Sequence, residues 1–182
     1  MNNSFTVKQA LVLILMSLFV MMGVQAASKN NNNSVRLGKH DIKVLLAEHN
    51  RARADVRVKP LKWSNGIARF SGTWAKRLAK KGCKIKHRPR GGKWQQQYGE
   101  NLFIGTKSYY GLAEAVRAWE NEKKDYKGDP VTRSNFRPIG HYTQMVWHNS
   151  THVGCAQSFC RDLRIVVCNY DPPGNYLGQK PY

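Results

Sequence analysis

One histidine of this sequence stands in a stretch where an imidazole could do chemistry. His141 lies in GHYTQMVW, Gly140 to Trp147, together with two aromatic and two aliphatic residues and shortly after Pro138, which suits the start of a helix. An imidazole can ligate a metal or carry a proton near neutral pH. A histidine among apolar neighbours is more often simply hydrogen-bonded in the core, so His141 needs partners from elsewhere in the chain.

Two glutamates stand at positions where a carboxylate is unexpected. Glu122 follows Ala115 and Trp119 and precedes Tyr126 at intervals of four, three and four, which places it on the apolar face of a helix. Glu100 lies in the stretch YGENLF, between a glycine and a run of amide and apolar residues. A buried carboxylate is destabilising unless it is paired or hydrogen-bonded. Because the whole chain has eleven acidic residues, two inward ones predict partners.

Three amphipathic helices are predicted to position these residues. The spacing of apolar residues predicts a first helix over 41–56, a second that Ser64 caps and that ends near Gly82, and a third over 109–125. His49 and its neighbour Asn50 fall on the apolar side of the first helix, and we interpret them as polar groups satisfied in the core. The segment before the His141 stretch lacks periodicity and predicts a loop over 127–138.

The C-terminal part of the chain contains the pattern of a β-hairpin. VGCAQSF (153–159) and RIVVCNY (164–170) are two apolar runs on either side of a turn at Arg161 and Asp162. A hairpin centred on that turn brings the cysteine of one run opposite the cysteine of the other.

The four cysteines are therefore predicted to form two disulfides. The hairpin places Cys155 opposite Cys168, which leaves Cys83 to meet Cys160. Disulfides are favoured over a metal site because the N-terminal segment, described next, predicts export from the cell. On chain-entropy estimates the long link contributes about 4 kcal/mol and the short one about 3 kcal/mol.

The N-terminal segment has the pattern of a signal peptide. An apolar run of about fifteen residues follows Lys8 and leads to a small-x-small cleavage pattern ending at Ala26, and the run is too short to span a membrane. We therefore expect the mature protein to be secreted and extracellular, without a transmembrane segment. The predicted parts are a signal peptide over 1–26, a disordered polar leader over 27–36 and one folded domain over 37–182.

Positive charge dominates the composition. The formal charge is +19, and loss of residues 1–26 removes one lysine and no acid, which leaves +18 on the mature chain. Between Lys76 and Lys93 there are nine cationic residues and no acid, with His87 among them. Such a surface favours anionic partners: phospholipid head groups, cell-wall polymers or acidic glycans. Nucleic acid is not an expected partner, because no recognition motif accompanies the charge.

Five stretches of the chain, taken in order, resemble those of a known family. They are YGENLF (98–103), WENE (119–122), GHYTQMVW (140–147), HVGCA (152–156) and IVVCNYDPPGNY (165–176). On these stretches the chain resembles the CAP superfamily of cysteine-rich secretory proteins, antigen-five allergens and plant pathogenesis-related class-one proteins. The resemblance covers about residues 38–182. It implies an α+β fold, a three-layer α-β-α sandwich with a small antiparallel sheet between helices.

The resemblance also implies a cleft that contains a tetrad of two histidines and two glutamates: His87, Glu100, Glu122 and His141. No cofactor is required, but such a set can hold zinc or another divalent cation, and a carboxylate outside the metal's ligands could serve as a general base. The structural alternative is that each glutamate accepts a hydrogen bond from one histidine. The family's cysteine pairing agrees with the two disulfides predicted above.

Three functions remain open on this resemblance. We expect a non-enzymatic extracellular binder of lipid, sterol or anionic surfaces, acting in defence or host–microbe interaction, because the family is associated with those roles. The alternatives are a metal-dependent hydrolase that uses the tetrad, and a precursor from which the C-terminal segment 172–182 is released as a signalling peptide. We also expect a monomer, and Asn149 begins an N-glycosylation pattern.

Overall fold

The computed structural model of the chain describes residues 37–182. The predicted signal peptide and leader lie outside the described residues and stay predictions. Within residues 37–182, none of the helices has the length and apolar character needed to cross a membrane. The elements are α2 (Lys39–Ala54), β1 (Lys62–Trp63), α3 (Asn65–Lys80), β2 (Gly99–Thr106), α4 (Leu112–Glu120), the 3₁₀-helix η1 (Asn121–Asp125), α5 (Phe136–Met145), β3 (His152–Cys160) and β4 (Leu163–Asp171).

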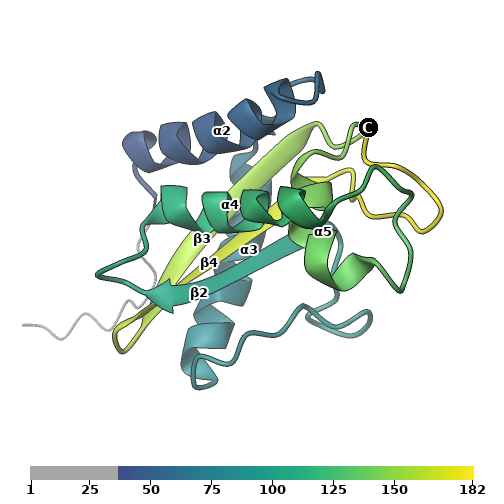
Figure 1. Ribbon diagram of the computed structural model, residues 1–182. Helices are drawn as coiled ribbons and strands as arrows, with labels where there is room; N and C mark the ends of the chain where they lie inside the picture. The colour runs from purple at the N-terminus through teal and green to yellow at the C-terminus, as the bar shows by residue number, and fades with distance from the viewer. Residues whose placement is uncertain (1–36) are drawn as a thin grey trace, which may run out of the picture. The chain divides into compact units, whose positions relative to one another are not determined.

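A four-stranded sheet lies between two helical layers (Figure 1). The strand order is β1-β3-β4-β2, with β1 parallel to β3 and the other neighbours antiparallel. Helix α3 packs against β3 and β4 on one face, while α2, α4 and α5 cover the other. The architecture is the α+β, three-layer α-β-α sandwich that the resemblance implied.

Strand β4 lies in the interior of the sheet, and both of its faces are buried by helices. Ile165 and Val167 pack into the cluster formed with α3, whereas Val166, Cys168 and Tyr170 pack into the cluster formed with α2, α4 and α5. Successive strand residues point to opposite faces, so a strand with helices on both sides has a continuous apolar sequence. This is why the run RIVVCNY lacks the alternation of a half-exposed strand.

The first two helices agree with the predictions to within a few residues. Ser64 caps α3 through a 3.3 Å hydrogen bond from the backbone N of Ile67. His49 is fully buried on α2, where its Nδ1 lies 2.7 Å from the carbonyl oxygen of Leu45 and its Nε2 lies 2.8 Å from the Tyr170 hydroxyl. The prediction that His49 is a satisfied core histidine is therefore confirmed.

The hairpin and both disulfides are also confirmed. Strands β3 and β4 pair with Cys155 opposite Cys168, and these two cysteines are bonded. The second disulfide joins Cys83, just after α3, to Cys160 at the end of β3. One link crosses the sheet's central strand pair, and the other attaches the end of α3 to the sheet.

The predicted third helix, over 109–125, was wrong as a single element. The α-helix ends at Glu120 and continues as the 3₁₀-helix η1, which contains Glu122. A 3₁₀-helix has three residues per turn, so the α-helical spacing does not hold there. Glu122 nevertheless points inward, because its carboxylate accepts hydrogen bonds from the backbone N of His141 and of Tyr142.

Two further features near the cleft were not predicted correctly: the strand β2 and the start of α5. No pattern predicted β2, an edge strand whose first four residues are buried and whose last four are half-buried. Its sequence therefore lacks the alternation that indicates a half-exposed strand. The loop predicted over 127–138 ends earlier, since α5 begins at Phe136, and Pro138 is its third residue.

A buried arginine joins α2 to the end of α5. Arg53 is fully buried and donates hydrogen bonds of 2.7–2.9 Å to four backbone carbonyl groups, those of Lys59, Met145, Trp147 and Ser150. No carboxylate lies within ion-pair distance of its guanidinium in the described part of the chain. Burial lowers the pKa of Arg53 to about 10, so the group stays charged at neutral pH.

Substitution of Arg53 by methionine should lower the free energy of unfolding by about 3 kcal/mol or more, because several buried carbonyl groups lose their donor. Chemical denaturation measures this change. The control is Lys59→Met in the same segment, where the side chain is exposed and the effect should stay within about 0.5 kcal/mol. Equal stabilities of the two variants would contradict the role assigned to Arg53.

His49 should make the protein less stable in acid. Burial lowers the pKa of His49 from 6.5 to about 4, so between these values the unfolded chain binds a proton that the folded chain does not. Stability is therefore lost as pH falls from 6.5 to 4, by up to roughly 3 kcal/mol. In urea titrations across this range, His49→Gln should show a correspondingly shallower pH dependence. A variant with the same slope as the parent protein would rule out His49 as the cause.

Candidate functional site

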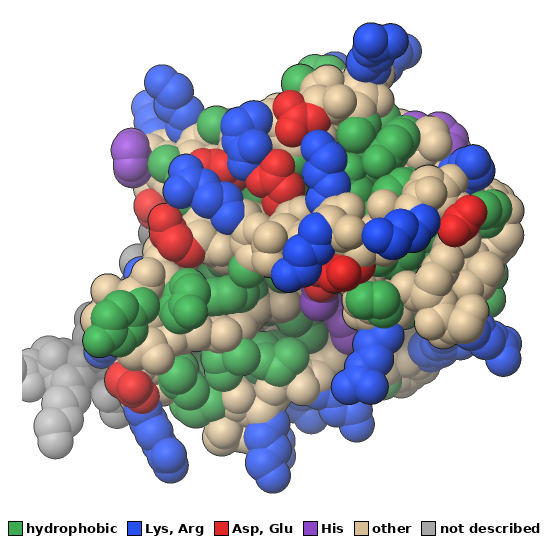
Figure 2. All heavy atoms as spheres, viewed as in Figure 1, with side chains coloured by type: hydrophobic (Ala, Val, Ile, Leu, Met, Phe, Trp, Pro, Cys, Tyr) green, Lys and Arg blue, Asp and Glu red, His purple; other side chains and the backbone are tan. Residues whose placement is uncertain are grey.

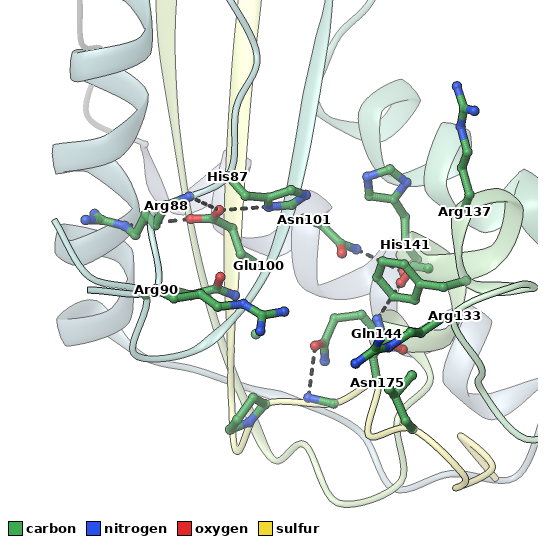
Figure 3. Close-up of a pocket in the computed structure, with 17 residues that line it drawn as sticks. His87, Arg88, Arg90, Glu100, Asn101, Arg133, Arg137, His141, Gln144 and Asn175 are labelled. Carbon is green, nitrogen blue, oxygen red and sulfur yellow. Dashed lines mark hydrogen bonds and ion pairs between the residues drawn. The ribbon is translucent and has the colours of Figure 1, made fainter. Parts of the chain in front are cut away.

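A cleft of about 850 Å³ opens between the loop before β2, the start of α5 and the C-terminal segment (Figure 3). The residues that line it come from four parts of the chain. They are His87, Arg88, Arg90 and Gln96 from the loop; Gly99, Glu100 and Asn101 from β2; Arg133, Phe136, Arg137, Gly140, His141 and Gln144 from α5 and the turn before it; and Pro173, Gly174, Asn175 and Leu177 from the tail.

The first pair of tetrad residues joins the loop to β2. His87 Nδ1 lies 2.9 Å from Glu100 Oε1, and the same oxygen accepts a 3.0 Å hydrogen bond from the backbone N of Arg88. Because an ionised carboxylate only accepts, Nδ1 carries the hydrogen. The Glu100 side chain is fully buried, whereas that of His87 is 54% exposed. The imidazole therefore faces the cleft while its carboxylate lies behind it.

Arg88 supplies the positive charge that Glu100 needs in this buried position. Its Nε lies 3.7 Å from Glu100 Oε2, and its side chain is almost fully buried. The guanidinium stacks 3.7 Å above the centroid of the Phe70 ring and donates 2.6 Å hydrogen bonds to the Phe70 carbonyl and the Thr73 hydroxyl. Burial lowers the pKa of Arg88. In the sequence this arginine is indistinguishable from the exposed cations around it.

The second pair joins η1 to α5. His141 Nδ1 lies 2.6 Å from Glu122 Oε1, while Glu122 Oε2 accepts the backbone N–H of His141 at 2.8 Å and that of Tyr142 at 3.2 Å. Trp119 stacks on the His141 ring, with 6.2 Å between centroids and 19° between planes. The carboxylate and the indole fix the orientation of the ring, whose side chain is 34% exposed.

Asn101 connects the two pairs. It follows Glu100 on β2 and points to the opposite face of the sheet, where its Nδ2 donates to the carbonyl oxygen of His141 at 3.0 Å and to the Tyr170 hydroxyl at 3.2 Å. Glu100 and Asn101 are consecutive on β2 and point to opposite faces of the sheet. Glu100 thus holds His87 on one face, while Asn101 holds the backbone of His141 on the other. The stretch YGENLF predicted an unusual carboxylate but not this role of the amide.

The C-terminal segment forms the remaining wall of the cleft. Gln144 Oε1 accepts a 2.9 Å hydrogen bond from the backbone N of Gly174, and Asn175 Nδ2 donates to the Gly140 carbonyl at 2.8 Å. Asn175 Oδ1 in turn accepts from the Thr143 hydroxyl at 2.7 Å. These bonds hold the tail against α5.

The four predicted tetrad residues therefore form two histidine–glutamate pairs, of which His87, Glu100 and His141 line the cleft while Glu122 holds His141 without lining it. The Nε2 atom of each histidine makes no hydrogen bond with another residue of 37–182, so both atoms could bind a ligand. Within the same range, no group of three or more His, Cys, Asp or Glu residues is arranged to hold a metal ion.

Asn149, which begins the N-glycosylation pattern, is exposed between α5 and β3, and its glycosylation stays a prediction.

None of the four arginines that line the cleft was predicted as a site residue. Arg88 and Arg90 belong to the basic run 76–93, which was predicted only to favour anionic partners in general. Arg137 precedes His141 by four positions, and this helical spacing could have indicated a shared face, whereas Arg133 lies in the turn before α5. The periodicity was missed because residues 127–138 were predicted to be a loop.

Comparison with known proteins gives a consistent set of relatives. A model of the cysteine-rich secretory protein family, CAP, matches residues 46–170. Pathogenesis-related protein 1B of Nicotiana tabacum is 46% identical over 138 residues, 75% of this chain and 78% of that protein. Pathogenesis-related protein 1 of Arabidopsis thaliana is 44% identical over 135 residues, 74% of this chain and 78% of that protein.

Solved structures show the same fold. The crystal structure of NaASP2 with Zn²⁺ superimposes with a TM-score of 0.70 at 25% sequence identity, over 84% of this chain and 88% of that one.

Proposed function

Because the chain belongs to the cysteine-rich secretory protein (CAP) family, we propose that it is a defence-related protein that acts outside the cell by binding lipid at anionic surfaces. The pathogenesis-related names of its relatives support the defence role. The two disulfides support an extracellular location, because such bonds persist in oxidising compartments. The exposed basic segment before the cleft supports the mode of binding.

The basic segment 76–93 presents its charge to solvent. Seven of its cationic side chains are exposed, and within residues 37–182 none of these seven is in an ion pair. Most acidic side chains on the face seen in Figure 2 lie instead over α2 and α4, with Lys and Arg side chains among them, and Arg51 and Arg117 pair with acids there. The exposed cations are Lys76, Lys80, Lys81, Lys84, Lys86, Arg90 and Lys93.

Apolar groups accompany this charge. Ile85 is 39% exposed between Lys84 and Lys86. Just after the segment, Trp94 is half-buried, with the Arg77 guanidinium 4.5 Å from its ring centroid. Lysines attract an anionic membrane, while an aliphatic side chain and an indole fit the boundary between head groups and acyl chains. This combination favours a lipid surface over a purely polar polyanion.

The triple substitution of Lys84, Lys86 and Lys93 by glutamine should weaken binding to anionic vesicles by about a hundredfold, because each lysine near such a surface contributes about 1 kcal/mol. Co-sedimentation with phosphatidylcholine vesicles, with and without phosphatidylglycerol, measures the partition coefficient.

The matched control removes the same charge from exposed lysines elsewhere, Lys39, Lys43 and Lys62. It should retain most of the binding, and added salt should weaken the parent protein's binding. Equal losses in the two triple variants would show that net charge, and not the basic segment, is responsible.

A metal site is a second candidate, favoured by the orientation of the two histidines. Each ring donates Nδ1–H to a glutamate and leaves Nε2 for a ligand, which is the arrangement of metal-binding histidines with carboxylate partners. The structurally similar NaASP2 was crystallised with Zn²⁺. His87 and His141 would hold the metal, and Glu100 and Glu122 would orient them. When bound, zinc would supply Lewis acidity.

Zinc binding should depend on these two imidazoles. Calorimetric titration of the parent protein at pH 7.5 should show binding that His87→Ala combined with His141→Ala abolishes, while thermal unfolding shows the disulfide-linked fold intact. The control pair is His40→Ala with His152→Ala, which lies outside the cleft lining. Absence of heat in the parent, or equal affinity in the tetrad double variant, would leave the tetrad a structural feature.

Release of the C-terminal segment 172–182 is the third candidate function. Residues 176–180 are exposed, so a protease could reach this part of the tail. The same segment contributes Pro173, Gly174, Asn175 and Leu177 to the cleft. Release of the peptide would therefore remove one wall of the cleft, and peptide production would be coupled to loss of the binding site.

A further inference from the structure

Three guanidinium groups of the cleft have no partner in the described part of the chain. Arg90, Arg133 and Arg137 are exposed and line the cleft, and their guanidinium groups make no hydrogen bond or ion pair with another residue of 37–182. Arg51 pairs with Glu48 and Glu120, and Arg53 donates to buried carbonyl groups. Three further exposed arginines also have no side-chain partner in this range, but they lie outside the cleft lining: Arg57, Arg69 and Arg161. The cleft thus brings three unpaired arginines to one hollow.

The acidic groups of the cleft cannot neutralise these arginines. Glu100 is buried beside Arg88 and bonded to His87, while Glu122 is bonded to His141 and to two backbone N–H groups. The neutral amides are also engaged, since Gln144 and Asn175 hold the tail against α5. The arginines are therefore the donors left for a ligand.

Two of the three arginines approach the hollow from different walls. In Figure 3, Arg90 extends from the loop side and Arg133 from the α5 side, and their guanidinium groups point toward one another, whereas Arg137 points away along the rim. Phe136 and Leu177 are 42% and 54% exposed and line the same cleft. The arrangement combines two opposed cationic forks with apolar surface.

From this geometry we propose that the cleft binds the phosphomonoester head group of a lipid, with Arg90 and Arg133 donating to its oxygens from opposite sides. A guanidinium donates two parallel hydrogen bonds to neighbouring oxygens of a phosphate. A phosphomonoester has three terminal oxygens and close to two negative charges, so it can occupy two forks at once. A phosphodiester has two free oxygens and one charge, so the two opposed forks select the monoester.

The inference rests on the proposed function, because the lipid source of the phosphate depends on docking at a membrane. The basic segment 76–93 would supply non-selective attraction, and the cleft would supply selectivity among anionic lipids. Phe136 and Leu177 lie where the glycerol backbone or acyl chains of such a lipid could contact the protein.

The experiment compares two kinds of phosphatidylcholine vesicle, matched in zeta potential and assayed in EDTA so that no metal contributes. One contains phosphatidic acid, a phosphomonoester, and the other phosphatidylglycerol, a phosphodiester. The parent protein should partition at least about tenfold more strongly to phosphatidic acid, since one charge-assisted hydrogen bond is worth about that factor. Arg90→Gln combined with Arg133→Gln should lose this preference and still bind phosphatidylglycerol vesicles.

The matched control is Lys39→Gln with Lys43→Gln, which removes the same charge from α2 and should keep the preference. Both arginines are exposed, and thermal unfolding should show both double variants folded. A soluble arm titrates sn-glycerol 3-phosphate and inorganic phosphate by calorimetry, and only the parent and the lysine control should bind them.

The outcomes separate this inference from the proposed function. A preference that survives in the arginine double variant overturns the cleft assignment but leaves membrane binding intact. Soluble phosphates that bind without any preference for phosphatidic acid overturn the lipid source. Absence of binding to either vesicle overturns the proposed function, and the soluble arm then still tests the arginines. Stronger binding of polygalacturonate than of every phosphate ligand would assign the arginines to a carboxylate polymer instead.

Discussion

The buried guanidinium of Arg53 holds together parts of the fold that no covalent link joins. The two disulfides stabilise the β3–β4 hairpin and attach the end of α3 to it, but neither reaches α2 or α5. Arg53 on α2 donates to carbonyl groups at and beyond the end of α5, where the helix dipole favours a positive charge. Because α5 contains His141 and Arg137, the shape of the cleft depends on this buried cation.

Because the chain has few acidic residues, their positions determine which cationic side chains have an ion-pair partner. Glu48 and Glu120 pair with Arg51 and Arg117 across α2 and α4, and the hydrogen bond from Arg117 is the main cause that lowers the pKa of Glu48. The two cleft glutamates orient the histidines, as described above. With eleven acids against thirty lysines and arginines, the seven exposed cations of the basic segment and the cleft residues Arg133 and Arg137 have no ion-pair partner within residues 37–182. A general attraction to anionic surfaces and a localised anion site can therefore arise from the same imbalance.

The shape of the cleft depends on the C-terminal tail, residues 172–182. Gly178 and Gln179 exchange backbone hydrogen bonds with Val131, and the Tyr182 hydroxyl lies 3.1 Å from that of Tyr142. These contacts, together with those of Gly174 and Asn175, attach the tail to the segment before α5 and to α5 itself. Ligand binding in the cleft and retention of the tail are therefore expected to stabilise one another.

Local sequence patterns determined those features that depend on neighbours in the chain. The hairpin, its Cys155–Cys168 pairing, the Ser64 cap and the buried His49 all follow from periodicity or turn chemistry, which act over a few residues. The inward direction of Glu100 and Glu122 was also readable, because a carboxylate among apolar residues needs a partner. That the two histidines His87 and His141 belong with these glutamates came only from the family resemblance. Which histidine each glutamate meets was decided by the structure, since the partners are separated by 13 and 19 positions.

Tertiary structure alone decided the roles that depend on distant segments. Arg88 and Arg90 are two positions apart in one basic run, yet Arg88 is buried against Phe70 and Glu100 while Arg90 faces the cleft. Arg133 becomes a cleft residue because it lies in the turn directly before α5, which the fold places at the wall of the cleft. A charged side chain has no periodic signature of its own. Its function is set by which buried or opposite charges the fold brings to it, and those come from other elements.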